Sequence, residues 1–282
     1  MKIANKAYAK INLTLEVLNK RSDGYHNIRS IEQAVSIFDL IVINTTKSKD
    51  IKILCSERSV PDDENNLCYK AAQMFFRSAG ITNPGIAITI IKKIPTQAGL
   101  GGASADAACT LHMLNKMFRA NLSIKDLCFI GAKVGADVPF CLVGGTMLVQ
   151  GIGEKLSVCE KLQDCYVVIV KPEVNICTRK AYDLIDSTYC KDKNLTDKAL
   201  AALKSKNLDD ICSCLYNRFE TILNTNETKL IKRSFLEFGA SGSLMTGSGS
   251  AVYGLFKDKD TALNCANIFL KSYKKTFICK TI

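Results

Sequence analysis

Residues 95–108 read PTQAGLGGASADAA, and the spacing of apolar residues changes across this stretch. Before it, residues 86–91 alternate as in a strand, and their mostly apolar character predicts burial on both faces. After it, the apolar residues between 107 and 118 fall at helical spacing. The intervening glycines let the backbone turn tightly and bring its amides close to a ligand, and the free N–H groups at a helix start favour an anion. The stretch therefore predicts a phosphate-binding loop between a strand and a helix.

The order of small residues in this loop separates it from the commonest nucleotide-binding motifs. It lacks the GxxxxGK[ST] order of a P-loop and the third glycine of the dinucleotide-binding fingerprint. The HRD and DFG elements of protein kinases are absent from the chain. A merely flexible loop is the alternative, but Pro95 stiffens the entry and the small residues continue unbroken into the helix.

Length and composition predict a globular protein with a substantial core. The 282 residues, of which 47% are hydrophobic, suffice for one or two domains, and we expect two. No apolar run reaches the roughly 18 residues of a membrane-spanning helix, and residues 1–6 carry no signal-peptide core. We therefore expect a cytoplasmic protein without a membrane partner. The 13 cysteines contain no C-x-x-C spacing, so we interpret them as reduced core residues.

The formal net charge of +11 raises the question of a nucleic-acid partner. The lysines are spread from Lys2 to Lys280 without a basic block, and tryptophan is absent. Both features argue against a nucleic-acid surface. We interpret most of the charge as a solvated surface, which also suits small anionic substrates. A non-catalytic nucleotide- or RNA-binding module remains the alternative from a different class.

The N-terminal region predicts strands around a turn. Apolar and polar residues alternate over 10–17, so Lys10 and Asn12 share a face, although a lysine at a strand edge is usually solvated. A turn at residues 23–24 precedes strands over 28–36 and 40–43. Tyr25 and His26 follow the turn, where an aromatic ring beside an imidazole can stack on a base and hydrogen-bond to it.

Helix signals follow in the first half. Asn66 is placed to cap a helix that Gly80 ends, and Ser123 with Asp126 forms a capping-box pattern for a helix through residue 134. Asp137 is placed to cap a short helix, with a proline in its first turn. From spacing alone, Asn66 and Asp137 are therefore capping residues.

The second half predicts an α+β, ferredoxin-like layer. A strand over 166–170 precedes several helices, and a strand, a helix and a final strand follow them. The helices are expected at about 178–187, 196–205, 208–223 and 227–238.

The glycine-rich stretch resembles the second sequence motif of the GHMP kinases, a family of small-molecule kinases. Residues 9–13 with 21–26, residues 135–139 and residues 244–254 resemble further segments of this family, in the family's order along the chain. The resemblance implies a two-domain α+β fold, with an N-terminal ribosomal-protein-S5-like domain and a C-terminal ferredoxin-like α/β domain. We expect the domains at residues 1–155, which carry the ATP phosphate loop, and 156–282.

The resemblance also implies an activity. The segment RSDGYH at 21–26 is similar to that of GHMP kinases acting on a cytidine-diphosphate-linked methylerythritol. This similarity implies that ATP, with Mg²⁺, phosphorylates the 2-hydroxyl of that substrate in non-mevalonate isopentenyl diphosphate biosynthesis. A GHMP kinase for homoserine or a sugar is the alternative. Either a monomer or a homodimer is compatible with this activity.

The family motifs imply roles for individual residues. Lys10 and Asp137 correspond to the catalytic residues, with Asp137 as the base, and no metal ligand is assigned. An aromatic ring at Tyr182 is expected to sandwich the cytosine opposite Tyr25. The implied ATP-binding residues are Asn66, Pro95, Thr96, Gln97, Ala98, Gly99, Leu100, Gly101, Gly102, Ala103, Ser104 and Ala105. The implied substrate-binding residues are Asn12, Tyr25, His26, Thr178, Tyr182 and Gly247.

The phosphate loop departs from the family pattern at a few positions. The family often has glycine where this chain has Ala98 and Ala103, and serine where it has Ala105. A methyl group at residue 103 narrows the loop, and the alanine at 105 removes a hydroxyl contact.

Overall fold

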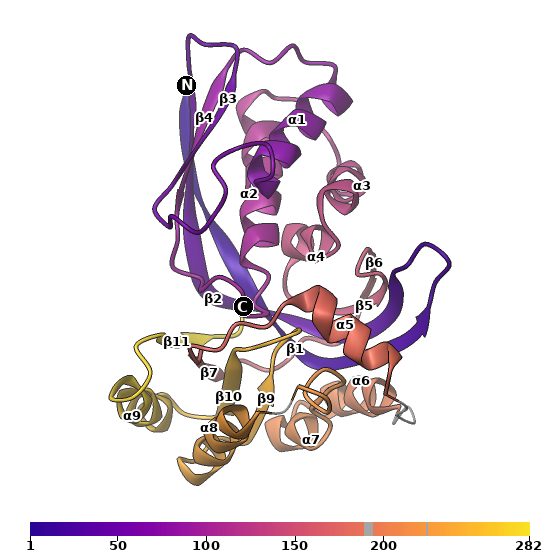
Figure 1. Cartoon of the computed structure of the whole chain (residues 1–282), viewed down its shortest axis with the longest axis vertical. Coiled ribbons are helices and arrows are strands. Elements are labelled where there is room, and N and C mark those ends of the chain that lie inside the picture. Colours follow the sequence, from indigo (N-terminus) through magenta and orange to yellow (C-terminus); the bar gives the residue numbers. More distant parts are fainter. Residues whose placement is uncertain (189–193, 224) are drawn as a thin grey trace. The chain divides into compact units, whose positions relative to one another are not determined.

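A computed structural model describes residues 1–188, 194–223 and 225–282. The chain forms two compact units, both visible in Figure 1. Unit 1 comprises Met1–Ala9, Phe38–Thr96 and Gly101–Gly144, and unit 2 comprises Lys10–Ile37, Gln97–Leu100 and Gly145–Ile282. The long strands β1 (Lys2–Lys20) and β2 (His26–Thr45) each contribute to both units. The expected boundary between residues 155 and 156 stays a prediction.

Unit 1 packs helices against one face of a sheet (Figure 1). Strand β4 (Ile86–Ile91) pairs parallel with β3 (Ile51–Cys55) and antiparallel with the end of β2. Only one face of β4 is fully buried, since Ile91 is 47% exposed, so the expectation of burial on both faces was wrong. The helices are α1 (Leu67–Ala79), α2 (Gly102–Met117), α3 (Ile124–Val134) and α4 (Val138–Val143).

The predicted helix ends in unit 1 are confirmed. Asn66 caps α1 by accepting a hydrogen bond from the Cys68 N–H, and Gly80 ends the helix in the left-handed region. Ser123 and Asp126 form a reciprocal capping box at the start of α3. These ends depend on residues a few positions apart, so the sequence alone was sufficient to find them.

Unit 2 contains a four-stranded antiparallel sheet in the order β11-β7-β10-β9. Helices α8 (Asn226–Glu237) and α9 (Lys259–Leu270) pack on it. Among the four strands of this sheet and the two helices packed on it, the chain order is β7, α8, β9, β10, α9, β11, which confirms the expected ferredoxin-like layer. Two strands lie between these helices, where the sequence prediction had one. The strands are β7 (Tyr166–Val170), β9 (Gly242–Met245), β10 (Val252–Phe256) and β11 (Thr276–Lys280).

The remainder of unit 2 corrects some local predictions. The helix expected over 208–223 ends at Ser213, because Tyr216 and Asn217 form β8, which pairs parallel with β1. The two strands expected over 28–36 and 40–43 are the single strand β2. The other elements of this unit are β5 (Thr146–Gly151), β6 (Lys155–Val158), α5 (Thr178–Asp186), α6 (Leu195–Ser205) and α7 (Leu208–Ser213).

Lys10 lies on a covered strand rather than at a sheet edge. Strand β1 has β2 on one side and β8 on the other, and Lys10 is only 4% exposed. The general expectation that a lysine at a strand edge is solvated does not apply here. Among the described residues, no helix has both the length and the apolar character needed to cross a bilayer.

Candidate active site

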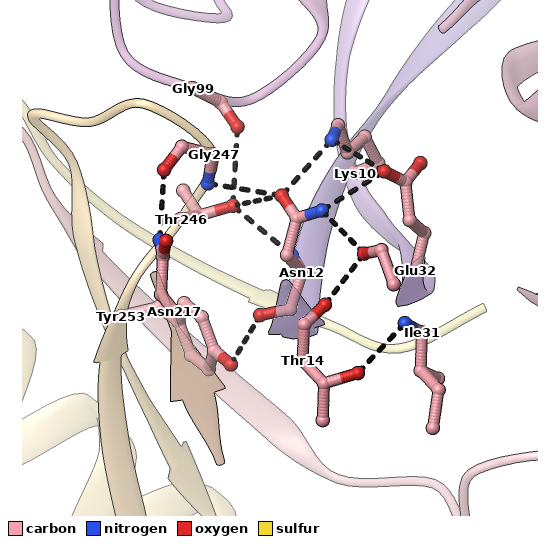
Figure 2. Close-up of polar contacts among 11 residues, drawn as sticks. Lys10, Asn12, Thr14, Ile31, Glu32, Gly99, Asn217, Thr246, Gly247 and Tyr253 are labelled. Carbon is pink, nitrogen blue, oxygen red and sulfur yellow. Dashed lines mark hydrogen bonds and ion pairs between the residues drawn. The ribbon is translucent and has the colours of Figure 1, made fainter. Parts of the chain in front are cut away.

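The ammonium group of Lys10 is held inside unit 2 by a carboxylate and a carboxamide (Figure 2). Lys10 Nζ lies 2.8 Å from Glu32 Oε1 and 3.0 Å from Asn12 Oδ1. Asn12 Nδ2 donates to the same Glu32 oxygen at 2.9 Å. All three residues are at most 4% exposed. A buried lysine with such partners is oriented rather than free to rotate.

The carboxamide of Asn12 also connects Lys10 to the turn after β9. Asn12 Oδ1 accepts a hydrogen bond from the Gly247 N–H at 3.0 Å. Thr246 Oγ1 accepts from the Asn12 N–H at 3.1 Å and lies 3.1 Å from the Gly99 carbonyl oxygen, to which it can donate. Figure 2 shows these contacts converging from three separate segments of the chain. The predicted site residues Lys10, Asn12, Gly99 and Gly247 therefore lie together in unit 2.

The sequence reasoning missed several residues of this network. Glu32 interrupts an apolar strand pattern, and a buried charge in such a pattern was a signal that could have found it. Asn217 donates to the carbonyl oxygens of Met245 and Gly247, and Tyr253 donates to the Asn12 carbonyl oxygen at 2.8 Å. No sequence signal pointed to Asn217, whereas Tyr253 lies within the family-like segment 244–254 but was given no role.

The part of the glycine-rich loop that belongs to unit 2, Gln97–Leu100, packs tightly on the turn after β9. The Ala98 carbonyl oxygen accepts from the Ala251 N–H at 3.2 Å, and the Leu100 carbonyl oxygen accepts from the Lys10 N–H at 3.0 Å. Gly99 has φ +74°, and a Cβ atom there would lie 2.0 Å from the Thr246 carbonyl oxygen. Glycine at this position is therefore required by backbone contact.

We expect Gly99→Ala to raise the KM for ATP at least tenfold and to lower the melting temperature. The added methyl group must displace the Thr246 backbone. In addition, the alanine backbone would have to take the left-handed conformation of Gly99, which alone costs about 1 kcal/mol. Gly80→Ala is the matched control, because Gly80 has φ +65° but no atom within 4 Å of the added Cβ. That control should lose stability without a change in the KM for ATP. Equal KM values for the two variants would contradict a role of this loop in ATP binding.

The rest of the loop lies in unit 1 and leads into α2. Gly101 occupies the N-cap position of α2 with φ +68°, and no side chain caps the helix. The first N–H groups of α2 are therefore available to an external anion. Gly102 packs against Ile94 and the Lys92 ammonium, where a Cβ would lie 3.1 Å from Ile94 Cγ2. The predicted residues Pro95, Thr96, Ala103, Ser104 and Ala105 belong to the same unit.

Asn66 and Asp137 also lie in unit 1. Asn66 is 5% exposed, and its carboxamide accepts from the Cys68 N–H and donates to the Pro61 carbonyl oxygen. Asp137 occupies the N-cap position of α4, but its side chain makes no capping hydrogen bond to that helix. The capping explanation of Asp137 therefore fails, while the ATP role of Asn66 and the catalytic role of Asp137 stay predictions.

The predicted base-recognition residues form a second cluster in unit 2. The His26 and Tyr182 rings stack, with centroids 4.9 Å apart and planes 18° apart. His26 Nε2 lies 2.6 Å from Asp186 Oδ1, and Lys20 Nζ lies 2.5 Å from Asp186 Oδ2. These contacts from Lys20 and His26 lower the pKa of the Asp186 carboxyl group, so Asp186 is ionised at neutral pH. Sequence reasoning missed Asp186.

The other predicted substrate residues of unit 2 lie at the surface. Tyr25 is 59% exposed, and its backbone N–H donates to Asp23 Oδ1. The Oγ1 atom of Thr178, at the start of α5, lies 2.8 Å from Ser248 Oγ. In this structure Tyr182 stacks on His26. The sandwich of a base between Tyr25 and Tyr182 stays a prediction.

Comparison with known proteins assigns the family of this chain. The model of the GHMP kinase N-terminal domain matches residues 66–145, and that of the GHMP kinase C-terminal domain matches residues 197–275. This chain belongs to the GHMP kinase family and is an ATP-dependent small-molecule kinase. The expected family and its two-domain α+β fold are confirmed.

Similar proteins carry one recurring name. A Clostridium tetani protein named 4-diphosphocytidyl-2-C-methyl-D-erythritol kinase is 40% identical over 279 residues, which cover 98% of this chain and 99% of that protein. A Caldicellulosiruptor saccharolyticus protein of the same name is 42% identical over 281 residues, covering 98% of this chain and 96% of that protein.

Solved structures of GHMP kinases have the same fold as this chain. A crystal structure of 4-(cytidine 5'-diphospho)-2C-methyl-D-erythritol kinase superposes with a TM-score of 0.81 at 29% identity, over 99% of both chains. A homoserine kinase from Cytophaga hutchinsonii, with a TM-score of 0.75 at 20% identity over 98% of this chain and 95% of its own, shares the fold.

Proposed function

We propose that this chain transfers the γ-phosphoryl group of ATP to the 2-hydroxyl of 4-diphosphocytidyl-2-C-methyl-D-erythritol. The products are the 2-phosphate and ADP, and the step belongs to non-mevalonate isopentenyl diphosphate synthesis. The observation that carries the proposal is the identity of about 40% over almost the whole chain to bacterial proteins of that name. The cytoplasmic location and the monomeric or homodimeric state are further parts of the proposal.

The proposed chemistry assigns a role to each catalytic candidate. The substrate hydroxyl oxygen forms a bond to the γ-phosphorus, the bond from that phosphorus to the β–γ bridging oxygen breaks, and ADP leaves. The hydroxyl proton passes to the Asp137 carboxylate, which acts as general base. Lys10 offsets the negative charge on the transferred oxygens. Because such transition states are loose, positioning and charge neutralisation contribute more than proton removal.

The surroundings of Lys10 support this role. Glu32 and Asn12 hold its ammonium group at 2.8 and 3.0 Å, and the three residues are buried. A preorganised charge does not have to reorient when the transition state forms. Asn12 Oδ1 accepts hydrogen bonds both from the Gly247 N–H and from Lys10 Nζ, so it fixes the position of the turn after β9 relative to Lys10.

Mg²⁺ is the proposed metal cofactor. In ATP sites, Mg²⁺ takes most of its ligands from phosphate and water, with few from the protein. Among the described residues, no three His, Cys, Asp or Glu side chains form a group that could hold a metal. We assign Mg²⁺ no protein ligand. When bound, the ion neutralises phosphate charge.

Product analysis tests the proposed function. Purified protein with ATP should form ADP only when the cytidine substrate is added, and the product should gain the mass of one phosphoryl group. NMR should locate that group on the 2-oxygen. Homoserine, mevalonate and galactose serve as competing acceptors. A higher kcat/KM with any of them would refute the substrate assignment and leave family membership intact.

We expect His26→Ala to raise the KM for the cytidine substrate about tenfold or more and the KM for ATP less than threefold. The loss of a buried hydrogen-bonding group that contacts the ligand costs about 1–3 kcal/mol. His112→Ala is the control, since His112 lies on α2 in unit 1 and contacts the Leu142 carbonyl oxygen. Steady-state kinetics with each substrate varied in turn measure the effect. Equal increases in both KM values would remove His26 from base recognition.

A further inference from the structure

A buried cluster of charges in unit 1 takes no part in the chemistry described above. Lys92 Nζ contacts Asp39 Oδ2 and lies 2.7 Å from Asp106 Oδ2. The exposed fractions of the three side chains are 7% for Lys92, 0% for Asp39 and 4% for Asp106. The cluster is therefore shielded from water, and its interactions are weakly screened.

The cluster is attached to the chain just before the phosphate loop. Lys92 directly follows β4, and two residues separate it from the start of the loop at Pro95. Asp39 Oδ1 accepts hydrogen bonds from the backbone N–H groups of Lys93 and Ile94, the latter at 2.8 Å. The Asp39 carboxylate thus holds the segment before the loop in two ways, through the backbone N–H groups of Lys93 and Ile94 and through the Lys92 side chain.

The cluster is also attached to the chain just after the loop. Asp106 lies near the start of α2, within five residues of the Gly101 N-cap. Gly102 packs directly over Lys92, with a Cβ position 3.4 Å from Lys92 Nζ. One buried ammonium therefore joins the strand that enters the loop to the helix that leaves it.

We propose that Lys92, Asp39 and Asp106 form a clamp that positions the phosphate loop for ATP without touching the nucleotide. The inference rests on the proposed function of this loop as the ATP phosphate site. The clamp sets the spacing between the end of β4 and the first N–H groups of α2, and an anion is bound best when those groups are already aligned. All three members are positioning residues.

The energetics of the cluster favour positioning over simple stabilisation. Asp106 Oδ1 is buried and has no hydrogen-bond partner in the part of the chain that the structure describes. Burial raises the pKa of the Asp106 carboxyl group to about 7, although Lys92 acts in the opposite direction. Burial also lowers the pKa of Lys92, but Asp106 and Asp39 outweigh this effect and the net shift is upward. A buried ionic cluster often stabilises a fold less than apolar side chains of similar volume.

The ionisation of Asp106 changes the stability of the folded state with pH, and the variant Asp106→Asn tests this effect. The titratable groups around Asp106 are Lys92 after β4, Asp39 on β2, Cys55 on β3, Cys68 on α1 and Cys109 on α2. The folded state keeps a proton on Asp106 up to about pH 7, whereas the unfolded chain releases it near 3.8, the ordinary pKa of an aspartic acid side chain. Asp106 therefore lowers the stability of the folded state as the pH rises between these values. Asp106→Asn has no carboxyl group at this position, so its stability should not fall in this pH range for this reason.

The test measures stability and ATP kinetics of Asp106→Asn together at pH 8. We expect a melting temperature equal to or above that of the wild type, since the buried side chain at residue 106 no longer has to ionise. We also expect the KM for ATP to rise about three- to tenfold, because the amide replaces a charged partner of Lys92. The KM for the second substrate should stay within twofold. An unchanged KM for ATP would overturn the clamp.

Companion variants separate positioning from folding. Lys92→Arg should retain more ATP affinity than Lys92→Met, because the arginine keeps the charge between the two carboxylates. Glu16→Gln is the matched control, since Glu16 is a buried carboxylate of unit 2 that accepts from the Leu195 and Thr196 N–H groups. It should lose stability and keep the KM for ATP. If Glu16→Gln raised that KM as much as Asp106→Asn, the effect would be general and the clamp would be refuted. Failure of the wild type to use ATP at all would instead refute the proposed function.

Discussion

Asp137→Asn is expected to lower kcat by about 10²–10⁴-fold, the usual contribution of a general base. The substitution keeps the size of the side chain and removes its negative charge together with its ability to take the hydroxyl proton. The Asp137 side chain makes no capping hydrogen bond to α4, so the substitution breaks no such bond at the start of that helix. The dissociation constant for ATP should change less than threefold. Single-turnover kinetics and calorimetric ATP titration measure the two effects.

Asp126→Asn is the control for this variant. Asp126 is another aspartate of unit 1 at a helix start, where it belongs to the capping box of α3. Its replacement should cost about 1 kcal/mol of stability and leave turnover intact. Near-normal turnover of Asp137→Asn would show that the proton leaves by another route, and Asp137 would then not be the base.

Lys10→Met should lower kcat about 10²–10³-fold, the typical loss when one preorganised electrostatic contact to the transition state is removed. The loss should fall mainly on kcat, because the proposed role of Lys10 is to offset charge that develops during transfer. The variant also leaves the buried carboxylate of Glu32 without this cation, which destabilises the fold. Kinetics must therefore be measured together with thermal unfolding.

Variants around Lys10 distinguish lost chemistry from lost folding. The double variant Lys10→Met with Glu32→Gln removes the uncompensated charge and should recover stability but not turnover. Lys6→Met is the external control, because Lys6 lies on the same strand, is exposed, and contacts the Phe38 ring. It should behave as the wild type. Recovery of turnover in the double variant would mean that Lys10 acts only through structure.

Local patterns predicted much of the fold. The capped helices α1 and α3, the strand β7 and the ferredoxin-like order follow from periodicity and capping signals within short segments. The local predictions failed where a segment distant in the sequence pairs with the chain. The helix expected over 208–223 stops because Tyr216 pairs with Thr14 on β1, a partner some 200 residues earlier in the sequence.

The candidate site divides in the same way. The glycine-rich loop and the family motifs pointed to Lys10, Asn12, Gly99 and Gly247, which the structure brings together in unit 2. Glu32, Asp186 and Asn217 had no motif to identify them. Each is held by hydrogen-bonded partners on other segments of the chain, so only the folded chain shows its role.

The sequence by itself determined the family, the glycine-rich turn between β4 and α2 and the ends of the short-range elements, because glycine conformation, helix capping and hydrophobic period act between residues close in the chain. The tertiary structure alone decided which polar and charged side chains meet. It paired Lys10 with Glu32, His26 with Asp186, and Lys92 with Asp39 and Asp106. The physical reason is that a charge removed from water must be met by another polar group, and that partner is chosen by the packing of distant strands and helices, which no local pattern encodes.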